Sequence, residues 1–134
     1  MKRNILISTV LLLSLFAFIR CSDFPIDEDG LLITERSECY VSNFDLVDTS
    51  HETVRTSAAV IDTLECTVNV EVRFGTDLRS LWPRFTLCED AKLDPKVTGY
   101  TDFSDLNNPR KYTVIAGNRK IKKTYTVFVS VQKP

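Results

Sequence analysis

The chain has 134 residues, and its 17 basic and 18 acidic side chains give a formal net charge of −1 at pH 7. This length allows one small domain with a single hydrophobic core. The balance of charges gives no general excess of positive charge of the kind that nucleic-acid binding needs.

The first predicted element is an export signal at residues 1–20. Lys2 and Arg3 form a positive head, and an apolar run extends from Ile5 to Ile19. As a helix this run covers roughly 22 Å, which is short of the hydrocarbon core of about 30 Å. A secretory signal is therefore predicted rather than a membrane span. Its removal takes away three positive charges and moves the net charge from −1 to −4, so we expect no nucleic-acid partner.

The segment FIRCSD at the end of this signal resembles the lipobox of bacterial lipoproteins. The resemblance implies that Cys21 is acylated, becomes the first mature residue and attaches the protein to a membrane. Arg20 departs from the pattern, in which Gly, Ala or Ser precedes the cysteine. An uncleaved signal anchor and cleavage at another site remain alternatives. Each of them also places residues 22–134 outside the cytoplasm.

Residues 21–37 are interpreted as an acidic, flexible tether. They contain the acidic run DEDG, and both Pro25 and Gly30 discourage regular structure. Acidic residues just after a lipidated cysteine also resemble the surface-export signal of Bacteroidetes-type lipoproteins. That resemblance implies an outer-membrane lipoprotein of the cell envelope, exposed at the cell surface.

Alternating apolar and polar residues predict β-strands in the rest of the chain. The strongest alternation is TLECTVNVEVRF at 63–74, where the inward phase runs from Leu64 to Phe74 and includes Cys66. Residues 122–133 repeat the pattern with Tyr125, Val127, Val129 and Val131 inward. Shorter strands are predicted at 39–46, 84–91 and 111–117, and residues 58–62 lead into the long strand.

Helical patterns are nearly absent after residue 21. One helical turn is predicted at 76–82, with Thr76 as its cap. Short strands separated by turn residues, with no helices between them, predict an all-β fold and an antiparallel β-sandwich. The last strand is apolar along one face, so we expect it to lie centrally or to close the sheet.

Four segments that follow one another carry a second resemblance. They are YVSNFDL, TVNVEVRFGTDLRSLWPRFTL, GYTDFSDLNNPRKYTVIAGN and KKTYTVFV. Together they resemble a family of small immunoglobulin-like, cadherin-like domains of Bacteroidetes-type surface lipoproteins. The resemblance implies one immunoglobulin-like sandwich at 38–134 that serves as a spacer or accessory module in glycan uptake, without shared catalytic residues. Arg73 departs from the family, in which proline is usual, and so does the longer basic segment AGNRKIKKTY.

Three cysteines remain if Cys21 is acylated. One disulfide is allowed in an oxidising compartment; a buried thiol is the expected state of Cys66, and a pair would involve Cys39 rather than Cys66. No C-x-x-C spacing is present, and His51 is the sole histidine. We therefore expect neither a metal site nor a cofactor.

Two features are candidate binding surfaces. Trp82 lies between Leu81 and Pro83, which favours packing at the start of a strand, while an exposed tryptophan would offer a platform for sugar rings. The basic residues near the C-terminus predict either a solvated hairpin tip or a contact for an acidic polysaccharide, a lipid phosphate or an acidic protein patch. They are Arg119, Lys120, Lys122 and Lys123.

Catalysis has little support in the sequence. His51 is followed by Glu52, but no G-x-S-x-G motif accompanies them. We predict a non-catalytic, exported and lipid-anchored envelope protein that acts as an accessory or binding module, with glycans as candidate ligands. The alternative is a structural subunit that docks to a larger surface complex through its last strand or its basic hairpin.

Overall fold

The computed structural model describes residues 25–134 and divides the chain into two compact units, with the division between Ile33 and Thr34. The signal peptide predicted at 1–20 and the lipidation predicted at Cys21 lie outside the described residues. The flexibility of the tether predicted at 21–37 stays a prediction as well.

The described part of the first unit, residues 25–33, is a tight loop. Ile26 forms an isolated bridge with Leu32. One carboxylate oxygen of Asp27 accepts the amide protons of Asp29 and Leu31, each at 2.9 Å. An aspartate that accepts nearby backbone protons in this way closes a turn without regular structure.

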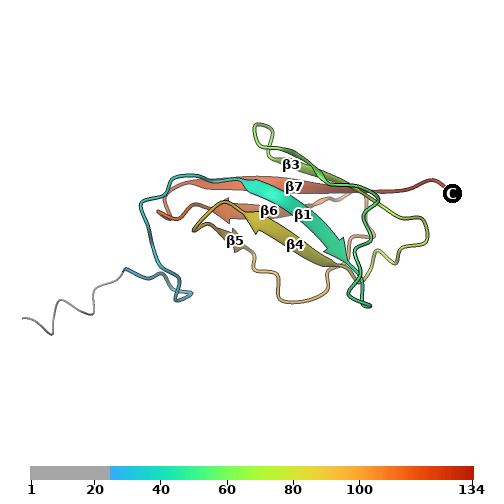
Figure 1. Ribbon diagram of the computed structural model, residues 1–134, viewed down its shortest axis with the longest axis horizontal. Coiled ribbons are helices and arrows are strands. Elements are labelled where there is room, and N and C mark those ends of the chain that lie inside the picture. Colours follow the sequence, from blue (N-terminus) through green and yellow to red (C-terminus); the bar gives the residue numbers. More distant parts are fainter. Residues whose placement is uncertain (1–24) are drawn as a thin grey trace, which may run out of the picture. The chain divides into compact units, whose positions relative to one another are not determined.

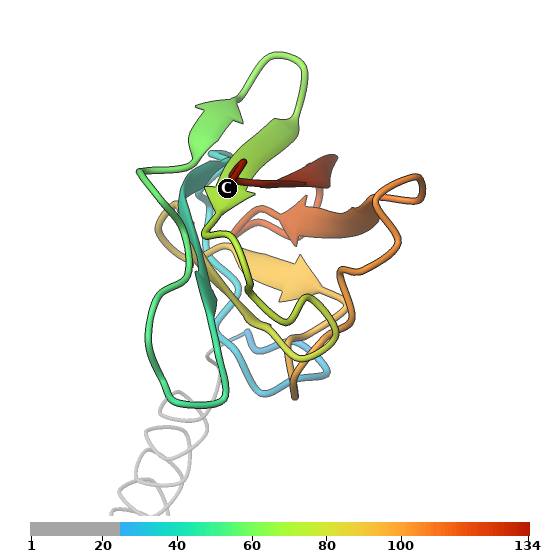
Figure 2. The same cartoon turned by 90° about the vertical axis from the view of Figure 1, so that its right-hand side faces the viewer.

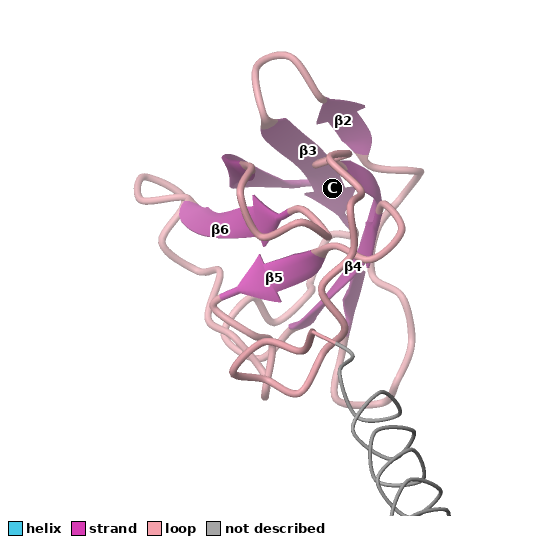
Figure 3. Ribbon diagram, turned by 90° about the vertical axis from the view of Figure 1, so that its left-hand side faces the viewer, coloured by secondary structure: helices cyan, strands magenta, loops and turns pink. Residues whose placement is uncertain are grey.

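The second unit, residues 34–134, consists of strands and loops, with no helix among its residues (Figure 3). In chain order the strands are β1 Val41–Val47, β2 Val60–Asp62, β3 Thr67–Val72, β4 Trp82–Leu87, β5 Lys92–Asp94, β6 Arg110–Ile115 and β7 Lys122–Val131. β1 and β4 form one sheet, and the other five form a second sheet in the order β2-β3-β7-β6-β5 (Figure 1). The prediction of an all-β fold is confirmed, and the two sheets are consistent with a sandwich.

One strand pair differs from the predicted antiparallel arrangement. β3 and β7 run parallel, with Val68 opposite Val127 and Val72 opposite Val131. The remaining pairs of named strands are antiparallel. The two parallel strands are far apart in the sequence, so no hairpin forces them to run in opposite directions. β7 lies between β3 and β6, which confirms the central position predicted for the last strand.

β3 is about half as long as the strand predicted at 63–74. Asp62 accepts the amide protons of Leu64 at 2.9 Å and Glu65 at 3.0 Å, and these bonds close a turn between β2 and β3. Leu64 is 92% exposed at the tip of this hairpin, which projects from the unit (Figure 2). Phe74, beyond the other end of β3, is 63% exposed. The inward positions predicted for these two residues are wrong, because the alternation extends into turns.

The helical turn predicted at 76–82 is also absent. The side chain of Asp77 accepts the amide proton of Arg79 at 3.0 Å in a non-helical turn. Trp82 already belongs to β4. Thr76 instead donates its hydroxyl proton to the carbonyl of Arg73, at 2.7 Å.

The hydrophobic core lies between the two sheets. The ring of Phe85 in β4 is 4.7 Å from that of Phe44 in β1 and 4.8 Å from that of Tyr112 in β6, measured between centroids. These aromatic contacts join the smaller sheet to the larger one. Phe103 is also buried, and its amide donates to the carbonyl of Leu78 at 2.7 Å.

Candidate functional site

Trp82 and Tyr100 form an aromatic pair in the second unit. Leu81 and Thr101 exchange backbone hydrogen bonds of 3.1 and 2.8 Å in an isolated antiparallel bridge. Residues next to such a bridge face each other, so Trp82 lies opposite Tyr100. Their ring centroids are 5.7 Å apart and the ring planes meet at 84°, an edge-to-face arrangement. This pair is called the aromatic platform below.

The aromatic platform lies at the surface of the smaller sheet. Pro83 and Phe85 alternate with Trp82 along β4 and belong to its inward phase, so Trp82 and Arg84 belong to the outer face. Trp82 is half-buried, and Tyr100 is 45% exposed. Tyr100 therefore supplies most of the solvent-exposed aromatic surface of the platform, and Trp82 supplies a smaller part.

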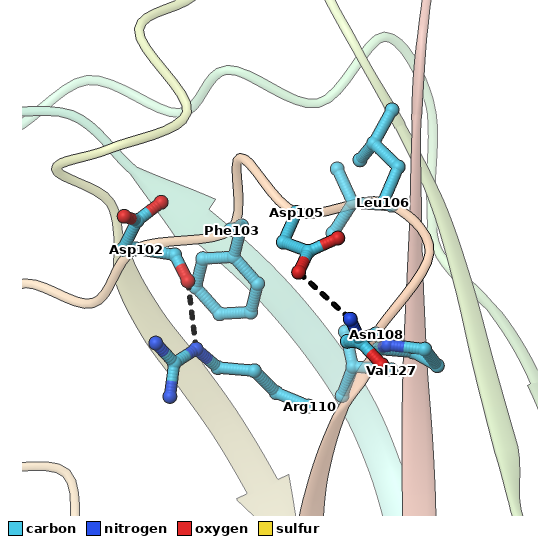
Figure 4. Close-up of a pocket in the computed structure, with 9 residues that line it drawn as sticks. Asp102, Phe103, Asp105, Leu106, Asn108, Arg110 and Val127 are labelled. Atoms are coloured by element: carbon cyan, nitrogen blue, oxygen red, sulfur yellow. Dashed lines mark hydrogen bonds between the residues drawn. The ribbon is translucent and has the colours of Figure 1, made fainter.

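A pocket of about 380 Å³ opens beside the segment that leads from Thr101 to β6 (Figure 4). Its apolar wall includes Phe103, Leu106, Val127 and Val129. Its polar lining is Asp102, Asp105, Asn108 and Arg110. We call it the loop pocket, because residues 102–110 supply most of its lining.

Hydrogen bonds hold the polar side chains of the loop pocket in place. Arg110 donates from Nε to the carbonyl of Asp102 at 2.7 Å, and its guanidinium carbon lies 5.9 Å from the centroid of Phe103. Asp105 accepts a hydrogen bond from the side-chain amide of Asn108 at 2.8 Å (Figure 4). The polar residues that line the loop pocket are therefore held in place by hydrogen bonds within residues 102–110.

Asp102 stays ionised well into the acidic range. The side chain and the amide of Ser104 both donate to its carboxylate, and these two bonds lower the pKa of Asp102 below its usual value. The positive charges of Arg110 and Arg79 lower this pKa further. Arg79 is itself paired with Asp77, at 3.1 Å.

The four basic residues predicted as one surface do not make a single patch. Arg119 donates from one guanidinium nitrogen to the carbonyls of Asp90 and Ala116, both at 3.0 Å. Lys122 and Lys123 are consecutive residues of β7, so their side chains point to opposite faces of the sheet. Lys120, the fourth of the set, is exposed. The positive charge of the hairpin is thus dispersed.

The cysteines of the second unit are all free thiols. Cys39 and Cys88 are buried, whereas Cys66, predicted to be a core residue, is only partly buried. The thiol of Cys39 donates to the carbonyl of Val114 at 3.1 Å. Burial raises the pKa of the Cys39 thiol, and the neighbouring Cys88 raises it further. The disulfide that the sequence left open is not formed.

The described residues contain no arrangement for metal binding, and the single histidine lies in a turn. His51 lies in a turn, where its amide donates to the carbonyl of Asp48 at 3.0 Å. Within residues 25–134, no group of three or more His, Cys, Asp and Glu side chains is arranged to hold a metal ion. The same part of the chain has no helix that is long and apolar enough to cross a membrane.

Comparison with protein families identifies the class of protein. Residues 48–129 match the family described as SGBP, N-terminal, and the chain belongs to this family. It comprises N-terminal domains of glycan-binding proteins from the surface of Bacteroidetes. No curated protein matches the chain.

Solved structures from Bacteroides share the fold. A candidate glycoside hydrolase from Bacteroides thetaiotaomicron is 30% identical, with a TM-score of 0.57 over 75% of this chain. The match spans 28% of that protein, so this chain covers little more than a quarter of its length.

Two further similar structures show the fold alone. A candidate secreted protein from Bacteroides fragilis is 18% identical, with a TM-score of 0.51 over 72% of this chain and 97% of that one. A DUF4623 family protein from Bacteroides eggerthii is 20% identical, with a TM-score of 0.53 over 72% of this chain and 22% of that one.

Sequence reasoning singled out Trp82 but missed its partner and the loop pocket. Tyr100 and the acids at 102 and 105 carry no pattern in the sequence that distinguishes them from packing residues or solvated loop residues. The bridge between Leu81 and Thr101 brings Tyr100 to Trp82, and a single bridge leaves no periodic pattern in the sequence.

Proposed function

We propose that this protein is a non-catalytic, lipid-anchored envelope protein that contacts glycans through the aromatic platform. The observation that carries the proposal is the surface pair of Trp82, which is partly buried, and Tyr100, which is 45% exposed, in a member of a family of surface glycan-binding proteins. Aromatic side chains combine a large apolar face with little conformational freedom, so they suit the apolar C–H faces of sugar rings.

Binding of soluble oligosaccharides to the full-length, detergent-solubilised protein tests this proposal. The probes are hexasaccharides of glucose and xylose with different linkages, measured by calorimetry. Trp82→Ala should weaken binding about tenfold or more, because it removes one ring of the platform. A tenfold loss of affinity corresponds to about 1.4 kcal/mol of binding free energy. Phe74→Ala is the matched control, since Phe74 is an exposed aromatic residue outside the platform. Equal loss in both variants, or wild-type affinity in Trp82→Ala, would contradict the proposal.

The lipid anchor at Cys21 is a separate part of the proposal. It is supported by the apolar run that ends two residues before Cys21 and by the surface location of the family. Cells fed a labelled fatty acid should label the wild-type protein and not Cys21→Ala, and the variant should leave the membrane fraction if its signal is still cleaved. An unlabelled wild-type protein that stays in the membrane would indicate the uncleaved signal anchor instead.

Docking to a larger complex through the last strand would have to use the ends of that strand. β7 is hydrogen-bonded to β3 on one side and β6 on the other, so it offers no free edge over its central residues. Residues 122–125 of β7 pair only with β6, and residues 128–131 pair only with β3. β2 and β5 are the outer strands of the larger sheet, so a protein partner could pair with one of these edges as well as contact a face or a loop.

A further inference from the structure

We propose that the loop pocket continues the aromatic platform, so that one end of the domain binds consecutive units of an uncharged oligosaccharide. This inference rests on the glycan-binding function proposed above and names its ligand class. It requires that the two surfaces are close, that the pocket suits a sugar, and that its charge disfavours acidic glycans.

The platform and the pocket are close because one short segment carries both. Tyr100 precedes Asp102 by two residues, and an extended chain covers about 3.3–3.6 Å per residue, so their Cα atoms are at most about 7 Å apart. Thr101 between them is fixed by its two backbone hydrogen bonds to Leu81. The spacing between the surfaces is therefore set by the fold.

The loop pocket has the composition that a sugar requires. Its volume of about 380 Å³ falls within the range of about 300–1,000 Å³ typical of small-molecule sites. Leu106, which is 49% exposed, and Val129 supply an apolar wall for the C–H groups of a sugar ring. A carboxylate has about four lone-pair sites, so Asp102 and Asp105 can accept protons from sugar hydroxyls besides the bonds that they already make.

The charge of the pocket selects against acidic sugars. Two carboxylates, Asp102 and Asp105, line it together with one guanidinium, that of Arg110. Arg79, whose charge reaches Asp102, is already paired with Asp77. A uronate or sulfate group would therefore meet a net negative surface, and like charges brought together at an interface oppose binding. An uncharged hexose meets no such penalty.

Chain length separates the contribution of the pocket from that of the platform. The full-length protein is titrated with neutral disaccharides and hexasaccharides and with oligogalacturonates of the same lengths. We expect the wild-type protein to bind a neutral hexasaccharide about tenfold more tightly than the matching galacturonate. Asp105→Ala should weaken binding of the hexasaccharide severalfold and leave the disaccharide, held on the platform, unchanged. Trp82→Ala should weaken both.

Controls keep the test independent of folding. Glu65→Ala removes an exposed acid from the β2–β3 hairpin and should bind as the wild type does. Asn108→Ala gives a second variant of the pocket, and the melting temperature of each variant is measured alongside.

The possible failures of the two proposals are distinguishable. If no glycan binds, the proposed function falls and this inference falls with it. If Trp82→Ala abolishes binding while both pocket variants bind every length normally, the function stands and the extended site is refuted. Tighter binding of the galacturonate would likewise refute the preference for neutral sugars.

Discussion

The backbone amide of Thr34 donates a hydrogen bond to the carbonyl of Gly117, 3.0 Å away. Nearby, the amide of Asn118 donates to the carbonyl of Arg36 at 2.9 Å. The guanidinium of Arg36 also forms an ion pair of 2.9 Å with Glu89. The beginning of the second unit is thus joined to two loops that are far away in the sequence.

Gly117 is the position at which this junction is most sensitive. A Cβ atom there would overlap the hydroxyl oxygen of Thr34 and lie 2.9 Å from the Cβ of Asp90. We expect Gly117→Ala to lower the free energy of unfolding by about 1–3 kcal/mol, the usual cost of an overpacked site. Urea denaturation followed by the fluorescence of Trp82, the single tryptophan, measures the change.

Gly99→Ala is the matched control for this prediction. No other atom lies within 4 Å of a Cβ built at Gly99. The substitution should be neutral or stabilise by up to about 1 kcal/mol, because alanine restricts the unfolded chain. Equal stability of the two variants would mean that residues 34–36 move aside at little cost.

Truncation of Phe103 tests how much the packing of this buried residue beside the loop pocket contributes to stability. Its side chain is only 4% exposed, and Phe103→Ala should lower the free energy of unfolding by about 3–5 kcal/mol. Phe74→Ala, at a residue that is 63% exposed, should change it by less than about 0.5 kcal/mol. Thermal denaturation monitored by circular dichroism compares the two. Similar losses would show that the difference in burial does not determine how much each phenylalanine contributes to the free energy of unfolding.

The sequence predicts the buried centre of β3 well and its ends poorly. Val68, Val70 and Val72 are buried as the alternation requires, because one face of the strand packs on the core. The strand begins only after the turn that Asp62 closes, and such a side-chain bond leaves no mark in the alternation. The hydrogen bonds that Asp62 accepts, and not the alternation, therefore set the start of β3.

The sequence also does not indicate which strands that are distant in the chain pair with each other. Turn residues indicate which neighbouring segments form hairpins, but the parallel contact of β3 with β7 joins segments without a common turn. The same limit applies to the aromatic platform, which depends on the bridge of Leu81 with Thr101. Trp82 was identified by its residue type, and its partner could be found only in the fold.

Tyr125 provides a test of polar satisfaction in the core. Its side chain is fully buried, and among residues 25–134 its hydroxyl has no hydrogen-bond partner in good geometry, although the backbone of Val41 is close enough to interact with it. An unsatisfied buried polar group costs about 1–3 kcal/mol. We therefore expect Tyr125→Phe to leave the free energy of unfolding unchanged or to raise it by about 1 kcal/mol.

Tyr112→Phe is the contrasting variant. The hydroxyl of Tyr112 interacts with the side chain of Thr101 through a hydrogen bond, so its removal should cost about 1 kcal/mol. Both variants are compared by urea denaturation at neutral pH. A loss in Tyr125→Phe as large as in Tyr112→Phe would show that the hydroxyl of Tyr125 is satisfied, by the backbone of Val41 or by a bound water.

The buried ionisable groups of the core predict that the protein loses stability in alkali. Burial raises the pKa of the Cys39 thiol above its ordinary value of 9.0, and it raises the pKa values of Tyr112 and Tyr125 above 10.0. The unfolded chain loses these protons first, so it binds fewer protons than the native protein over this range. The free energy of unfolding should therefore be unaffected by these groups below pH 9 and should fall as the pH rises toward their native pKa values.

Cys39→Ala separates the contribution of the thiol from that of the tyrosines. The variant lacks the group that titrates first, so its stability should begin to fall only near pH 10, where the tyrosines ionise in the unfolded chain. Urea denaturation at intervals from neutral pH to about pH 11 gives both profiles. If the two proteins lose stability in parallel from pH 9, the Cys39 thiol does not contribute, and its burial leaves its ionisation unchanged on folding.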